Sequence, residues 1–299
     1  MSKTNIPWCD EVWNPTTGCS FGCPYCYARE LHNKRNEAWR NGWEGAPAQY
    51  HVPFDRVQLF PERLEIPLRK KKPAVFFVNS MGDFFDPDVP DDFRDRAYAV
   101  MSLCPQHTFL VLTKRAEGMA DYWARGDEIY NRTGVIQVEA YKTNRRIGTG
   151  QPFNGGLSNC WHGVTAENQQ AAEERIPHLL RVPGKRFLSI EPMLGPVDLD
   201  RPTPGPDLHQ GGGQYICQPW FIQSGIHAVI LGGESGPNAR PMHPDWVRSI
   251  VHQCKAACVP VFVKQMGTAW AKENGVKKSG NDISLFPEDL QIRELPWHE

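Results

Sequence analysis

The sequence predicts an α/β fold in which parallel strands alternate with helices. Short, nearly continuous apolar segments recur along the chain, as expected for strands that are buried on both faces. An amphipathic segment follows most of them, and this order is typical of parallel strand–helix–strand units. The chain has 299 residues, which suffice for one barrel-type domain or for two smaller domains.

The short apolar segments predict seven strands: one near Val12 and Trp13, then residues 73–81, 107–113, 160–165, 186–190, 228–231 and 259–264. The amphipathic segments between them predict helices over residues 89–104, 117–130, 168–181 and 244–257. Pro90 and Pro244 suit the first turns of two of these helices. Pro177 lies inside another and predicts a kink or a break there.

We expect a single domain over residues 1–299. Residues 138–159 and 201–224 interrupt the alternation and are rich in glycine and polar residues, so they are interpreted as loop insertions. The segment from about residue 268 onward is polar and irregular, and we expect it to pack over one end of the barrel.

The composition narrows the class of protein. A net charge of -1 provides no overall basic field that would attract nucleic acid. No apolar run approaches the ~20 residues that span a bilayer, and the first residues lack an apolar signal core. We therefore expect a cytoplasmic protein without membrane contact, and a monomer. The nine cysteines are then expected to be metal ligands and buried thiols rather than disulfides.

Polar residues follow the predicted strands at the point where each strand ends. They are Asn79, Ser80 and Asp83; Thr113, Lys114 and Arg115; Thr165, Glu167 and Asn168; Ser189 and Glu191; Glu234 and Ser235; and Lys264 and Gln265. Ligands of parallel α/β folds bind at the carboxyl ends of the strands, so this pattern predicts one large polar site. Simple contact with solvent explains the lysines and arginines, but explains the acids in the apolar SIEP and GGES segments less well.

Three cysteines in the segment GCSFGCPYCYARE form the strongest motif. Cys19, Cys23 and Cys26 have C-x3-C-x2-C spacing. Three thiolates can bind three irons of a cubic cluster and leave the fourth iron open. Structural zinc prefers four ligands, and no partner pair follows at zinc-finger spacing, although Cys9 is a conceivable fourth ligand.

The other cysteines allow a second cluster, in which Cys254 and Cys258 are joined by Cys217 or Cys160. Buried thiols are the favoured interpretation of these four residues and of Cys104.

The cysteine spacing, with the aromatic Tyr25 before the last cysteine, resembles the radical S-adenosylmethionine superfamily. The resemblance implies a partial (β/α)6 barrel, a [4Fe–4S] cluster and S-adenosylmethionine bound to the open iron. It also implies a low-potential electron donor and a 5′-deoxyadenosyl radical that takes a hydrogen atom from the substrate.

A closer resemblance covers nearly the whole chain. The segments VWNPTTGCSFGCPYCYA, NSMGDFF, LTKR, GVTAEN, RFLSIEPMLGP, GGESGPNARPMHPDW and VFVKQMG are similar to the phage Gp37/Gp68-type proteins, also called DUF5131, which are related to the spore photoproduct lyase-like branch. The resemblance implies, by association, a modified thymine nucleobase in DNA as the substrate and an isomerase or lyase reaction. A phage-encoded protein would act in the host cytoplasm.

The superfamily has a GGE-like stretch after its second strand that contacts the methionine amine. Ser80, Gly82 and Asp83 occupy that place here, with Asp83 as the acceptor and Gly82 allowing close backbone approach. The literal Gly232-Gly233-Glu234 stretch lies much later, and it is interpreted either as a turn with a capping carboxylate or as a substrate or ribose contact.

The remaining strand ends also receive roles. We expect Tyr25, Thr113 and Lys114 to contact the cofactor. Lys114 or Arg115 binds the methionine carboxylate or a substrate phosphate, or contacts solvent. Glu167 and Asn168 bind ribose hydroxyls or cap the following helix. Glu191 is costly to bury without a partner, which favours a ligand or ion-pair role, and Lys264 is its candidate partner or a substrate contact. We assign the catalytic role to Glu191 and Lys264.

Three other functions remain open. The first is a radical enzyme that acts on a peptide or a small metabolite. The second is a non-catalytic iron–sulfur protein that binds DNA or acts as a sensor. The third is a structural zinc protein. The basic loop of Lys142, Arg145 and Arg146 near Tyr141 is either a nucleic-acid contact or a solvated loop.

Overall fold

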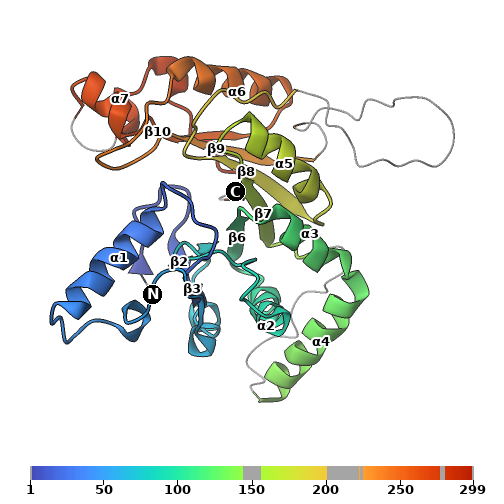
Figure 1. Cartoon of the computed structure of the whole chain (residues 1–299). Coiled ribbons are helices and arrows are strands. Elements are labelled where there is room, and N and C mark those ends of the chain that lie inside the picture. Colours follow the sequence, from blue (N-terminus) through green and yellow to red (C-terminus); the bar gives the residue numbers. More distant parts are fainter. Residues whose placement is uncertain (1, 144–155, 201–221, 223–224, 277–279, 298–299) are drawn as a thin grey trace. The chain divides into compact units, whose positions relative to one another are not determined.

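The computed structural model describes residues 2–143, 156–200, 222, 225–276 and 280–297 (Figure 1). The chain divides into two compact units, Met1–Trp161 and His162–Glu299, and each is described by itself. Among the described residues, no helix is long and apolar enough to cross a membrane.

The main sheet has the strand order β1-β2-β5-β6-β7-β8-β9-β10. Its strands are β1 Ser2–Lys3, β2 Glu11–Trp13, β5 Val75–Val78, β6 Thr108–Thr113, β7 Cys160–Thr165, β8 Lys185–Ile190, β9 Ala228–Gly232 and β10 Val261–Gln265. In the first unit β2 pairs with β5 and β5 with β6 in parallel, and in the second unit β8 pairs with β9 and β9 with β10 in parallel. These pairings confirm the predicted class, an α/β fold with a partial parallel barrel. The short antiparallel strand β1 was not predicted.

Seven α-helices are described: α1 Tyr27–Arg40, α2 Asp91–Ser102, α3 Ala116–Ala124, α4 Gly126–Thr143, α5 Gln169–Leu180, α6 Pro244–Ala256 and α7 Thr268–Glu273. The predictions of α2, α5 and α6 are confirmed within a few residues at their ends. Helix α5 continues through Pro177, so a break at this residue is wrong, while a kink stays a prediction. Pro177 lies in the last turns of α5, where the loss of one backbone N–H disturbs few bonds.

The predicted helix over residues 117–130 is two helices, which are separated at Arg125. Helix α4 then extends to Thr143, so the first residues of the predicted insertion 138–159 are helical. The predicted insertion 201–224 lies outside the described residues except for Ile222, which is buried. The segment from about residue 268 is less irregular than predicted, because it begins with α7.

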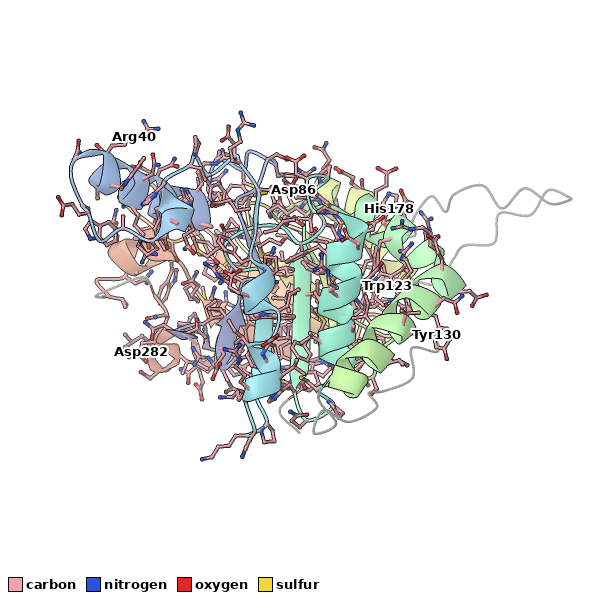
Figure 2. The ribbon with its side chains drawn as sticks, turned by 90° about the horizontal axis from the view of Figure 1, so that it is seen from below. Arg40, Asp86, Trp123, Tyr130, His178 and Asp282 are labelled. Carbon is pink, nitrogen blue, oxygen red and sulfur yellow. The ribbon has the colours of Figure 1, made fainter. Side chains whose placement is uncertain are left out.

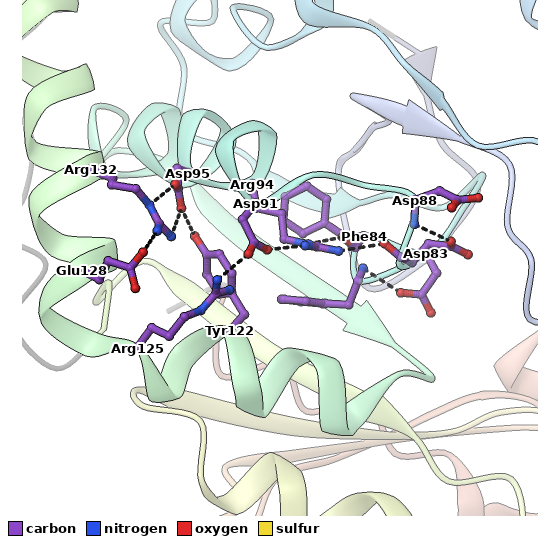
Figure 3. Close-up of polar contacts among 12 residues, drawn as sticks. Asp83, Phe84, Asp88, Asp91, Arg94, Asp95, Tyr122, Arg125, Glu128 and Arg132 are labelled. Atoms are coloured by element: carbon purple, nitrogen blue, oxygen red, sulfur yellow. Dashed lines mark hydrogen bonds and ion pairs between the residues drawn. The ribbon is translucent and has the colours of Figure 1, made fainter.

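Buried polar bonds explain why α4 forms against α2 (Figure 3). The Asp95 side chain of α2 is almost fully buried and accepts a hydrogen bond from the Tyr122 hydroxyl at 2.7 Å. The Arg132 guanidinium of α4 donates to the same carboxylate at 2.6 Å. Ile129 of α4 is buried, whereas Tyr130 lies on the exposed face of the helix (Figure 2). The stability of helix α4 therefore depends on contacts with α2, which lies earlier in the chain.

The register of the first unit brings three strand ends to one edge. Trp13 pairs with Val78, and Val78 pairs with Val111. Phe76 and Phe109 stack with ring centroids 5.5 Å apart and anchor the two central strands. The residues after β2, β5 and β6 therefore lie together, as expected at the carboxyl end of parallel strands.

The second unit repeats this arrangement. Ile190 pairs with Leu231, and Leu231 pairs with Val263, so the residues after β8, β9 and β10 share one edge. Backbone bonds from Val263 N to the Ile292 oxygen at 2.9 Å and from Glu294 N to the Val261 oxygen at 3.1 Å cover β10. The C-terminal segment thus satisfies backbone groups that an edge strand would otherwise expose.

The fully buried His162 of β7 makes the stability of the protein depend on pH. Burial, and then the nearby Arg186, lower the pKa of His162 to about 3 from the ordinary value of 6.5. A histidine that stays neutral in the folded state stabilises it above pH 6.5 and loses that contribution as the pH falls toward 3. The free energy of unfolding of the wild type should fall when the pH is lowered from 7 to 5. We expect this fall to be about 2 kcal/mol smaller in His162→Gln, as measured by urea unfolding.

The exposed His252 provides the matched control. The variant His252→Gln should keep the pH dependence of the wild type. An identical pH dependence in the wild type and in His162→Gln would contradict a buried neutral imidazole.

Candidate functional site

The three cysteines lie on the loop between β3 Thr16–Thr17 and α1, which we call the cysteine loop (residues 18–26). Its first residue, Gly18, has a φ of 88° and forms a bridge with Gly82, in the loop after β5. Gly18 N donates to the Met81 oxygen at 3.0 Å. A Cβ atom at Gly82 would lie 2.7 Å from the Gly18 oxygen, closer than such atoms pack. Gly82 thus allows close backbone approach, as predicted, but to Gly18.

Backbone N–H groups point at two of the three sulfurs. The Phe21 N–H donates to Cys19 Sγ at 3.4 Å, and the Arg29 N–H donates to Cys26 Sγ at 3.4 Å. Cys26 is also the N-cap of α1, where the helix dipole favours negative charge. These contacts are of the kind that stabilises thiolates and the sulfurs of iron–sulfur clusters.

Burial opposes thiolate formation at Cys19. It raises the pKa of this thiol to about 12, and the carboxylates of Asp83 and Asp86 add to the rise, against the Phe21 N–H and Arg115. Without a metal, Cys19 is therefore a protonated thiol at neutral pH. Metal binding has to displace that proton.

The cysteine loop fits a cluster in the number, type and spacing of its donors. Within the described residues, however, no group of three or more histidine, cysteine or acidic side chains stands ready to hold a metal ion.

The alternative of a second cluster also needs such a group, and the described residues contain none. The prediction of buried thiols is confirmed for Cys104, Cys160 and Cys254 and is wrong for Cys258, which is exposed. Cys217 lies outside the described residues. Burial raises the pKa values of Cys104 and Cys254 to about 12, as expected of thiols in an apolar core.

The loop after β5 is tied to both neighbouring segments. Asn14 Oδ1 accepts from the Met81 N–H at 2.9 Å and from Ser80 Oγ at 3.2 Å. The Tyr27 hydroxyl donates to the Ser80 oxygen at 2.6 Å. Ser80, a predicted cofactor residue, is therefore held beside the cysteine loop.

Asp83 and Thr113, both predicted as cofactor residues, bind each other. The buried Asp83 carboxylate accepts from Thr113 Oγ1 at 2.6 Å, from the Phe85 N–H at 2.9 Å and from the Lys114 N–H at 3.1 Å. These bonds join the ends of β5 and β6. A contact between Asp83 and the methionine amine stays a prediction, and it would have to use lone pairs that these three donors leave open.

Cationic side chains from the end of β6 lie over aromatic rings of the cysteine loop. Lys114 Nζ is 5.2 Å from the centroid of the Tyr25 ring, and the Arg115 guanidinium carbon is 5.4 Å from that of Phe21. Both contacts are within the range of cation–π interactions. The structure thus brings together Tyr25 and Lys114, which were assigned to the cofactor separately.

In the second unit, Glu191 and Lys264 form the predicted ion pair. Lys264 Nζ lies 2.6 Å from Glu191 Oε1, and Gln265 Nε2 donates to the same oxygen at 2.9 Å. Gln265 also donates to the Gly233 oxygen at 2.9 Å. The two charged side chains are only 20% and 15% exposed. Their catalytic roles stay predictions.

The other predicted site residues of the second unit bind residues of this same chain. Glu167 is buried and pairs with Arg175 of α5 at 2.7 Å, while Asn168 caps that helix through the Ala171 N–H at 2.9 Å. Glu234 accepts from Arg240 Nε at 2.6 Å. Gly233 packs directly against the backbone of Met266.

Sequence reasoning missed several residues of these networks. Asn14, Ser20 and Asp86 belong to the first unit, and Arg175 belongs to the second. Asn14 carries a weak signal, since it directly follows the end of β2, whereas Asp86 lies well beyond the end of β5. Arg145 and Arg146 of the predicted basic loop, and the side chain of Lys142, lie outside the described residues.

Comparison with known proteins identifies a family without a known activity. A family model described as "Protein of unknown function (DUF5131)" matches residues 3–286. No curated protein and no solved structure matches the chain.

The contact between Gly18 and Gly82 predicts a strong effect of one methyl group. Gly82→Ala should lower the free energy of unfolding by about 1–3 kcal/mol, because the new Cβ meets backbone that cannot move away. Gly118→Ala is the matched control, since its Cβ would lie 3.7 Å from the Phe85 oxygen, an ordinary contact. That change lies inside α3 and should stabilise by roughly 0.5–1 kcal/mol. Equal urea midpoints for the two variants would contradict the close approach.

The Glu191–Lys264 pair should show strong coupling in a double-mutant cycle. Glu191→Gln and Lys264→Met each leave a partly buried charge without its partner, so each should destabilise by about 1–3 kcal/mol. The double variant should lose less than the sum. The exposed pair Glu30–Lys34, with side chains 54% and 70% exposed, should couple by less than about 0.5 kcal/mol. Additive losses at Glu191 and Lys264 would show that the ion pair does not form.

Proposed function

We propose that this chain, which belongs to the DUF5131 family of proteins of unknown function, is an iron–sulfur enzyme that cleaves S-adenosylmethionine reductively. The observation that carries the proposal is the cysteine loop. Cys19, Cys23 and Cys26 have a three-ligand spacing, and backbone N–H groups point at two of their sulfurs.

Cys19, Cys23 and Cys26 would hold the cluster. When bound there, a [4Fe–4S] cluster supplies an electron to the sulfonium of S-adenosylmethionine, which yields methionine and a 5′-deoxyadenosyl radical that takes a hydrogen atom from the substrate. The electron comes from a low-potential donor protein. None of the eight described cysteines forms a disulfide, which suits a reducing compartment such as the cytoplasm.

The residues beside the cysteine loop would bind and orient S-adenosylmethionine. Lys114 supplies a cation next to Tyr25 for the methionine carboxylate. Ser80 and Gly82 present backbone at the end of β5. Asp83 and Thr113 fix the end of β6, from which Lys114 projects.

The residues at the strand ends of the second unit would act on the ribose and the substrate. Lys264 Nζ donates a hydrogen bond to Glu191 Oε1, and either side chain could exchange a proton with a substrate placed beside it. Glu167, Gly233 and Glu234 would line the same polar edge.

The proposed substrate is a modified thymine nucleobase in DNA, with an isomerase or lyase outcome. This part rests on the family resemblance alone, since the net charge of -1 gives no support for DNA binding. A peptide or a small metabolite is the alternative substrate class. The alternative function is that of a non-catalytic iron–sulfur protein that binds DNA or acts as a sensor.

The test is anaerobic reconstitution with iron and sulfide, followed by reduction with dithionite and incubation with S-adenosylmethionine. We expect the wild type to form 5′-deoxyadenosine, measured by chromatography, and Cys23→Ala to form none, because it lacks one cluster ligand. Cys258→Ala is the matched control, since Cys258 is an exposed cysteine outside the cysteine loop, and it should retain the activity.

Two results would contradict the proposal in different ways. A wild type that binds a cluster and forms no 5′-deoxyadenosine, even with nucleotides present, would favour the non-catalytic alternative. Equal activity in Cys23→Ala and the wild type would remove the cysteine loop from the chemistry.

A further inference from the structure

A buried carboxylate beneath the cysteine loop is not used by the function proposed above. Asp86 lies between β5 and α2 and is labelled in Figure 2, and its side chain is fully buried. Its Oδ2 atom accepts from the Ser20 N–H at 2.9 Å, from Ser20 Oγ at 3.0 Å and from Arg115 Nη2 at 3.2 Å. Asp86 therefore joins the cysteine loop to the end of β6.

The carboxylate is ionised in spite of its burial. Burial alone would raise the pKa of Asp86, but the Ser20 and Asp88 N–H groups, the Ser20 hydroxyl and Arg115 outweigh it and lower the pKa. A buried carboxylate is costly unless donors surround it, and here every one of these bonds is charge-assisted.

Arg115 closes the arrangement from the other side. Its Nη2 atom donates to Ser20 Oγ at 2.7 Å, and its guanidinium carbon lies 5.4 Å from the centroid of the Phe21 ring. The two residues that follow Cys19 are thus both held. We call Ser20, Asp86 and Arg115 the latch.

A purely local role explains only part of these contacts. Asp86 Oδ1 accepts from the Asp88 N–H at 3.2 Å, and the Asp86 backbone oxygen accepts from Arg94 Nη2 at 2.8 Å, which orders the turn before α2. That turn requires neither Ser20, which is 66 residues away in the sequence, nor Arg115, which is 29 residues away. These long-range bonds instead hold the cysteine loop against the chain around Asp86.

We propose that Asp86 is a positioning residue that, through Ser20 and Arg115, holds the cysteine loop in the conformation from which Cys19 binds iron. This inference rests on the proposed function, in which Cys19, Cys23 and Cys26 are the ligands. The cysteine loop has no regular secondary structure between β3 and α1, so its order depends on such cross-links. Without the latch, iron binding would have to order the loop and would be weaker.

The first measurement uses the full chain, reduced and free of metal. Hydrogen exchange of the peptide that covers residues 18–26 reports directly on the Ser20 N–H bond. In Asp86→Asn we expect this exchange to rise roughly tenfold, because the amide loses charge and faces its NH2 group toward a donor. Asp92→Asn, a change of an exposed carboxylate in α2, should leave the exchange unchanged.

Two further variants separate position from charge. Asp86→Glu keeps the charge but adds a methylene in a fully buried site, and it should also speed the exchange. Ser20→Ala removes the hydroxyl from an exposed residue, which preserves folding, and should speed the exchange by a smaller factor. If an Asp86 variant fails to fold, as shown by lost protection in β5 and β6, Ser20→Ala and Arg115→Gln carry the test.

The second measurement is the retention of iron by the reconstituted protein during challenge with a chelator. We expect Asp86→Asn and Asp86→Glu to lose iron roughly tenfold faster than the wild type and than Asp92→Asn. Faster exchange together with normal iron retention would overturn the role of Asp86 toward the metal. Unchanged exchange in the folded variants would overturn the latch itself. A wild type that takes up no iron would overturn the proposed function, and this inference with it, while the exchange data would still show whether the latch orders the loop.

Discussion

The close contact between the backbones of Gly18 and Gly82 is the constraint on which the candidate site depends. It places the cysteine loop against the loop after β5, and no side chain larger than hydrogen fits at Gly82. Asn14, Tyr27 and Asp86 then add hydrogen bonds around this contact. Polar bonds thus hold the loop, and its three cysteines are partly exposed.

The same arrangement sets two effects against each other at Cys19. Asp83 and Asp86 fix the strand ends and the cysteine loop, but their charges, together with burial, raise the pKa of the thiol. The Phe21 N–H and Arg115 oppose that rise. A thiol with a pKa raised in this way stays protonated and unreactive at neutral pH, and under the proposed function a metal would displace that proton.

The sequence predicts the parallel strands and the helices α2, α5 and α6, because their apolar patterns are local, whereas α1 was not predicted. It also offers Lys264 as a partner of Glu191, since the parallel strands of one sheet end at the same edge. The latch could not be predicted in this way, because Ser20, Asp86 and Arg115 are far apart in the chain and their pairing depends on the register of β5 and β6. At Gly82 the sequence predicts a close backbone approach but not its partner, which is Gly18. Helix α4 exceeds its prediction because Asp95 of α2 supports it.

The most direct test of the central claim is low-temperature electron paramagnetic resonance of the reconstituted, dithionite-reduced protein, recorded with and without S-adenosylmethionine. An iron that lacks a protein ligand is open to this cofactor. The account therefore predicts the signal of a reduced [4Fe–4S] cluster, a change in its shape when S-adenosylmethionine is added, and no such change in Cys23→Ala. A cluster signal that S-adenosylmethionine leaves unaltered, or a cluster that forms equally well without Cys23, would contradict it.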